Sequence, residues 1–255
     1  MTWLDLLALV AAGAAAGLIN TVVGSGTLIT FPTLLALGVP PVTANVSNTV
    51  GLVPGSLSGA WATRQDLNGQ RKRVLWLGTA SLLGGIAGAL LLLWLPSAAF
   101  DAIVPVLIGI GCLLVILQPS ISSRLAIRRM RLGADAGSVH GPILLWLATA
   151  LVGVYGGYFG AAQGVLLIAI LGIGLSESLP RVNAIKNVLA MITNAIAGVV
   201  FVFVSEVNWP AAIAIAIGSV FGAQVGGRVG RKLPAMVYRV IIVIVGVAAI
   251  VSLLS

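Results

Sequence analysis

Hydrophobic residues form ten runs along the chain, separated by short polar or glycine-containing stretches. The runs cover residues 3–22, 27–37, 43–62, 74–95, 99–118, 142–159, 164–175, 182–204, 208–230 and 235–254. Eight are long enough to cross a bilayer as helices. The two short runs, 27–37 and 164–175, would reach only about 17 to 18 Å against a hydrocarbon core of about 30 Å. We therefore predict an all-α polytopic membrane protein with about eight transmembrane helices and two short re-entrant or broken helices.

The same order of run lengths occurs twice, which predicts an internal repeat. Residues 1–120 would form the first repeat, 121–140 a basic cytoplasmic linker, and 141–255 the second repeat. Polar and glycine positions keep their spacing between the halves. Gly17, Gly24 and Gly38 lie 136 residues before Gly153, Gly160 and Gly174, and Asn48 and Gly59 lie 139 residues before Asn187 and Gly198.

Charged residues in the loops predict that the halves are inverted. Loop 64–73 and the linker are rich in arginine, which marks them as cytoplasmic. The second-half equivalent of loop 64–73 is "SEVNW" (205–209), which has no basic residue, whereas "GRKLPAMVYR" (230–239) is basic where its first-half equivalent is not. Equivalent loops would face opposite sides, an arrangement common in secondary transporters. Both termini are then predicted to be external.

Composition supports a membrane protein and excludes several other classes. The chain is 59% hydrophobic and 8% charged, with a mean hydropathy of +1.14, far from the roughly 25% charged residues of soluble domains. Its net charge of +8 fits the basic cytoplasmic loops, so we expect no nucleic acid partner. With one cysteine and one histidine, we expect no metal site or cofactor. No catalytic triad or paired buried carboxylate is present, so we expect no enzyme.

Each short run follows a glycine-rich break, "NTVVGSGT" (20–27) or "GVYGGYFGAAQG" (153–164). A helix that begins at such a break presents free N–H groups and the positive end of its dipole, which suit an oxyanion. The predicted substrate-binding residues at the breaks are Asn20, Gly24, Ser25, Gly26, Thr27, Tyr155, Tyr158, Gly160, Gln163 and Gly164. The alternative is that the hydroxyls satisfy backbone groups and the glycines allow close helix packing, as we expect for "GTASLLGGIAGA" and "GSVFGAQVGGRVG".

The next run of each half carries a polar face. Asn45, Asn48 and Thr49 share one face in the first half, and Asn183, Lys186 and Asn187 share one in the second. We expect these faces to oppose each other across a pseudo-two-fold axis and to complete the substrate site. The alternative is simple interhelical hydrogen bonding, worth about 0.6 kcal/mol per pair.

Lys186 is the charged residue of this set. Its stem could reach back to the cytoplasmic interface. Ionisable residues in membrane segments more often face a cavity or a partner, however. A cavity-facing Lys186 would attract anions from the cytoplasm.

The motifs together resemble one known family. Residues 17–67, 153–174 ("GVYGGYFGAAQGVLLIAILGIG"), 183–203 ("NAIKNVLAMITNAIAGVVFVF") and 225–234 are similar to the sulfite exporter TauE/SafE family. The resemblance implies a multi-pass permease of the inner (plasma) membrane whose partners are the lipid bilayer and a small sulfur-containing anion such as sulfite or a sulfonate. An anion channel and a non-transporting membrane scaffold remain as alternatives. No segment predicts an oligomeric state.

Overall fold

The structure is a computed structural model that describes residues 1–132, 143–229 and 235–254. Within these ranges every regular element is a helix, which confirms the all-α prediction. The elements are α1 (Trp3–Val22), α2 (Thr27–Ala36), α3 (Pro41–Ala62), the 3₁₀ helix η1 (Arg64–Leu67), α4 (Arg71–Trp94), α5 (Ser97–Leu132), α6 (Ile143–Tyr158), α7 (Gln163–Gly174), α8 (Leu179–Val204), α9 (Trp209–Val229) and α10 (Ala235–Leu254).

The helices follow the hydrophobic runs closely, with α5 as the exception. This helix continues to Leu132 and so takes in the first part of the predicted linker. Arg124 is exposed there. The rest of the linker, and the side chains of its remaining arginines, lie outside the described residues.

Five helical segments in the described part of the chain are long and apolar enough to cross a membrane. They are Trp3–Val22, Arg71–Trp94, Ser97–Arg124, Leu179–Val204 and Trp209–Arg228. α2 and α7 are short, as predicted, and α6 has only 16 residues. α3 has 22 residues, but its asparagines, serines and threonines lower its hydropathy. The total of eight spans therefore stays a prediction.

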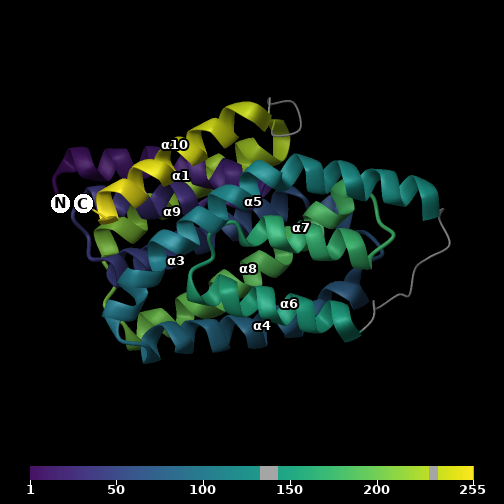
Figure 1. The fold of residues 1–255 in the computed structure, drawn as a ribbon, viewed down its shortest axis with the longest axis horizontal. Helices are drawn as coiled ribbons and strands as arrows, with labels where there is room; N and C mark the ends of the chain where they lie inside the picture. Colours follow the sequence, from purple (N-terminus) through teal and green to yellow (C-terminus); the bar gives the residue numbers. More distant parts are fainter. Residues whose placement is uncertain (133–142, 230–234, 255) are drawn as a thin grey trace.

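Helices from the two halves pack against one another throughout the molecule (Figure 1). α1 packs on α9, α4 packs on α6, and α3 and α8 contact each other between them. Close approach is possible because glycines line the contacts: a Cβ on Gly222 would overlap the Ala14 carbonyl, and one on Gly88 would overlap that of Val154. Gly88 belongs to the segment "GTASLLGGIAGA" and Gly222 to "GSVFGAQVGGRVG". Both were predicted to pack against neighbouring helices, and both glycines do so.

The short helices α2 and α7 lie beside the long terminal helices of each half, with α2 on α10 and α7 on α5. Both chain termini lie at one end of the molecule, and the C-terminal end of α5 lies at the other (Figure 1). Large apolar side chains such as Trp94, Phe203 and Phe221 are mostly exposed. A protein with such a surface requires an apolar surrounding.

Candidate functional site

The two glycine-rich breaks, one from each half, are in direct contact. The Gly164 N–H at the start of α7 donates to the Gly24 carbonyl just after α1, at 2.9 Å. A Cβ on either glycine would overlap the backbone of the other. Gly24 (φ 88°) and Gly160 (φ 77°) both have a left-handed backbone, which glycine adopts without strain. The structure therefore brings together the two segments that the sequence analysis selected.

Unpaired hydrogen-bond donors flank this contact. Ser25 and Gln163 are almost fully buried, and neither Ser25 Oγ nor Gln163 Nε2 has a hydrogen-bond partner. Buried polar groups are normally satisfied in proteins. Two unsatisfied donors, each next in sequence to one of the contacting glycines, therefore suggest a place where a ligand supplies the acceptors.

The tyrosines of the second break lie in different surroundings. The Tyr155 hydroxyl donates to the Ala161 carbonyl at 2.5 Å, which closes the break on itself. Tyr158 Oη is buried without a partner, and its ring packs against Phe100. Tyr155 thus holds the backbone of the break, whereas the Tyr158 hydroxyl is a third buried donor without a partner.

The polar face of α3 connects the two halves at the breaks. Asn48 Nδ2 donates to Thr27 Oγ1 at 3.3 Å, and the Thr30 hydroxyl donates to Asn48 Oδ1. Asn45 Nδ2 donates to the carbonyl of Tyr158, the last residue of α6, at 2.9 Å. The Thr49 hydroxyl donates within its own helix. α3 therefore fixes the start of α2 and the end of α6.

The polar face of α8 donates hydrogen bonds to the C-terminal end of α1. Lys186 is 0% exposed, and its Nζ donates to the carbonyls of Asn20 (2.9 Å) and Thr21 (3.3 Å). The amides of Asn183 and Asn187 also donate to the Thr21 carbonyl. The last carbonyls of a helix lack partners within it and carry its negative dipole end, so a cation and amide donors stabilise this position.

Two predictions about these side chains, and the alternative considered for Lys186, need correction. Asn48 and Asn187 do not face each other: Asn48 binds the threonines of α2, and Asn187 binds Thr21 and the Thr63 hydroxyl. Lys186 does not extend to the interface, because its ammonium is buried against α1. For the same reason the ammonium does not face a cavity in this conformation.

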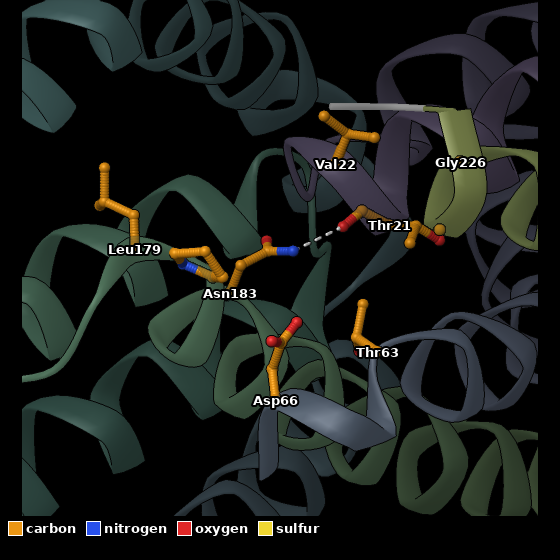
Figure 2. Close-up of a pocket in the computed structure, with 9 residues that line it drawn as sticks. Thr21, Val22, Thr63, Asp66, Leu179, Asn183 and Gly226 are labelled. Atoms are coloured by element: carbon orange, nitrogen blue, oxygen red, sulfur yellow. Dashed lines mark hydrogen bonds between the residues drawn. The ribbon is translucent and has the colours of Figure 1, made fainter. Parts of the chain in front are cut away.

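A pocket of about 200 Å³ leads from the surface to the end of α1 (Figure 2). Its lining consists of Thr21, Val22, Thr63, Asp66, Leu179, Pro180, Asn183, Gly226 and Gly227. The side chains of Asn183 and Asp66 point into it. Apart from Asn183, none of these residues was predicted to bind substrate. The pocket forms only where the ends of α1, α3, α8 and α9 meet, and no local pattern reveals that meeting.

The electrostatics of this region favour an anion. Lys186 forms no ion pair among the described residues, whose salt bridges join Glu177 to Arg73 (2.7 Å) and Arg181 (2.8 Å). The described residues also contain no cluster of metal-binding side chains. A buried cation without a carboxylate, close to free hydroxyl and amide donors, offers positive charge and hydrogen-bond donors together.

Comparison with known proteins identifies relatives over nearly the whole chain. The chain is 29% identical over 247 residues to a "Probable membrane transporter protein ORF9" of Sinorhizobium sp., covering 94% of this chain and 88% of that protein. It is 27% identical to the "Probable membrane transporter protein YfcA" of Escherichia coli K12, covering 90% and 82%. A "Probable membrane transporter protein" of Haemophilus influenzae is 26% identical, covering 94% and 91%. No solved structure matches.

The family comparison agrees with the resemblance seen in the motifs. The model of the family described as "Sulfite exporter TauE/SafE" matches residues 9–253, which include both breaks and every helix of the site. The chain therefore belongs to the sulfite exporter TauE/SafE family of membrane transporters.

Proposed function

We propose that this protein exports small sulfur-containing anions, such as sulfite or organosulfonates, across the inner (plasma) membrane. The anion would bind where the two breaks meet. The observation that carries this proposal is the pair of buried, unpartnered donors, Ser25 Oγ and Gln163 Nε2, on either side of the Gly24–Gly164 contact. The family description supports the class of substrate.

The chemistry of the donors matches that of sulfite and sulfonates. These anions present acceptor oxygens around one sulfur atom and have little capacity to donate. Hydrogen bonds to a charged partner contribute about 1.5–3 kcal/mol each. The stem of Lys186 passes beside Gly164, where a Cβ would approach the lysine Cδ. An anion at the breaks would therefore lie near the uncompensated ammonium and offset its cost of burial.

The packing of the helices supports an inverted repeat. If α1–α5 are equivalent to α6–α10, the α1–α9 contact corresponds to the α6–α4 contact, and α3–α9 corresponds to α8–α4; all four occur. The left-handed glycines Gly24 and Gly160 are also equivalent. Together with the opposite charges of equivalent loops, this arrangement predicts external termini and alternating access between the halves.

The membrane potential would supply the driving force. An anion that leaves an inside-negative cell gains about 2.3 kcal/mol per charge for each 100 mV. Export of this kind needs no carboxylate proton relay.

Two other functions make different predictions. An anion channel would show flux that saturates weakly with concentration and little counterflow. A membrane scaffold would use its polar faces for packing only and would bind no solute. Binding of sulfite to the purified protein therefore separates the scaffold from the other two.

The proposal is tested by measuring sulfite and methanesulfonate affinity calorimetrically with detergent-purified parent and Ser25→Ala proteins. Ser25→Ala should keep its thermal stability, because Ser25 Oγ has no partner to lose, while affinity falls roughly tenfold or more. Ser81→Ala is the matched control, since Ser81 Oγ is also buried and unpartnered but lies on α4. Equal affinities in all three proteins would place the anion elsewhere.

A further inference from the structure

The C-terminal end of α1 presents two backbone oxygen atoms to a buried ammonium. The Asn20 and Thr21 carbonyls point at the Lys186 ammonium. Asn183 and Asn187 reach the Thr21 carbonyl through their amides, and Asn183 Oδ1 is buried without a partner. Amide groups can present either their NH₂ or their oxygen after rotation. Two backbone oxygens thus face the ammonium in the structure, and rotation of the Asn183 and Asn187 amides would add their oxygens to this set.

This set of oxygens has the chemistry of a monovalent cation site. Carbonyls at the end of a broken membrane helix coordinate Na⁺ in secondary transporters, and the dipole of α1 places its negative end there. The pocket reaches Thr21 and Asn183, two residues of this set, and the side chain of Asp66 points into that pocket (Figure 2). A free cation in the pocket would therefore lie beside these ligands.

We propose that this is a monovalent cation site at the end of α1 and that the Lys186 ammonium fills it as a tethered cation. The inference deepens the proposed function, because it assigns the positive charge beside the anion to the chain itself. A carrier of this kind needs no dissociable Na⁺ to hold α1 in place. Removal of the ammonium should then turn the position into a site for Na⁺ or a small amine.

The Lys186→Ala variant tests this inference without any transport assay. It lacks the three carbons and the nitrogen beyond Cβ, which n-propylammonium replaces atom for atom. Lys186→Met is the matched control, because its uncharged stem refills most of the same space. The thermal unfolding of the parent and both variants in detergent would be measured in sodium, n-propylammonium and choline chlorides at equal ionic strength.

We expect n-propylammonium or Na⁺ to raise the melting temperature of Lys186→Ala by roughly 2–4 °C over choline, in a saturable manner. The parent should not respond, because its ammonium fills the site. Lys186→Met should not respond to n-propylammonium, because its side chain occupies the space that the propyl chain would take. Equal responses in all three proteins, or none in Lys186→Ala, would overturn the inference. Aggregation of Lys186→Ala in every salt would overturn it too, since a vacant cation site should recover the fold when a cation is added. The assay contains no sulfite, so failure of the proposed substrate leaves its result intact.

Discussion

Gly24 and Gly164 bring the backbones of the two halves into contact because neither residue has a side chain. Gly24 also has a positive φ of 88°. Two separate costs therefore apply when a methyl group is added there. One is the strain of the left-handed backbone, and the other is overlap with the opposite break.

Gly24→Ala should be much more damaging than Gly38→Ala. Gly38 has a similar φ of 79°, but a Cβ there meets nothing within 4 Å. The backbone strain costs about 1–2 kcal/mol in both variants, and overlap adds about 1–3 kcal/mol or more in Gly24→Ala. Reversible unfolding in mixed micelles measures the difference. Equal losses of stability would show that the two breaks are not in contact in the folded protein.

Lys186 and the asparagines explain why the site was predictable only in part. Their helical spacing identified a polar face, and the absence of a buried carboxylate identified an unusual lysine. Lys186, Asn183 and Asn45 have backbone carbonyls of Asn20, Thr21 and Tyr158 as their partners. Every residue has a backbone carbonyl. The sequence therefore does not indicate which carbonyl a distant side chain will bind. The location of the pocket beside Asp66 was unpredictable for the same reason.

Helix packing in this protein depends on stripes of small residues. Lipid tails are as apolar as leucine, so membrane helices associate through close van der Waals packing. α9 approaches α1 so closely that a Cβ on Gly218 or Gly222 would overlap carbonyl groups of α1. This contact joins the first helix of one half to the fourth of the other.

Gly222→Ala should separate α1 from α9 and destabilise the protein by about 1–3 kcal/mol. Gly109→Ala on α5 is the control, because the nearest atom to its Cβ would be 4.0 Å away in Ile250. That change should be neutral or stabilise the helix by up to about 1 kcal/mol. Unfolding of both purified variants in mixed micelles checks the prediction. A loss from Gly109→Ala as large as that from Gly222→Ala would contradict the packing argument.

Helix boundaries were predictable because the backbone N–H and C=O groups of an apolar run inside a bilayer must bond to each other, and a helix achieves this within one segment. The start of α1 shows a further local signal, since Thr2 and Asp5 form a capping box. The end of α5 was missed because a basic segment was assigned to a loop. Arginine and leucine are good helix formers, so charge alone did not end this helix before Leu132.

At the scale of the whole molecule, the proposed mechanism requires two halves of opposite orientation. Under the proposed repeat, α1–α9 corresponds to α6–α4 and α3–α9 corresponds to α8–α4, and all four contacts occur. Both termini lie at one end of the molecule (Figure 1). In such a mechanism, the breaks would be open first to one side of the membrane and then to the other. The Gly24–Gly164 contact lies at the junction of the two halves.

Labelling of single cysteines tests the orientation. In a Cys112→Ala background, the exposed positions Gln65 and Glu206 would each be changed to cysteine. The proposed inverted repeat makes their loops equivalent and places them on opposite sides of the membrane. A membrane-impermeant maleimide added to intact cells should therefore label Glu206→Cys and not Gln65→Cys. Permeabilised cells should show both labelled. Labelling of both, or of Gln65→Cys alone, in intact cells would refute the inverted topology.

The most direct test of the central claim is flux of labelled sulfite in proteoliposomes that contain the parent, Ser25→Ala or Ser81→Ala. We predict saturable uptake that follows the sign of an imposed membrane potential and is accelerated by unlabelled sulfite on the opposite side. Ser25→Ala should raise the half-saturating concentration roughly tenfold, and Ser81→Ala should behave as the parent. Folded protein that shows no sulfite flux under any gradient, or flux that is identical in all three proteins, would contradict a carrier that holds this anion at the meeting point of its two breaks.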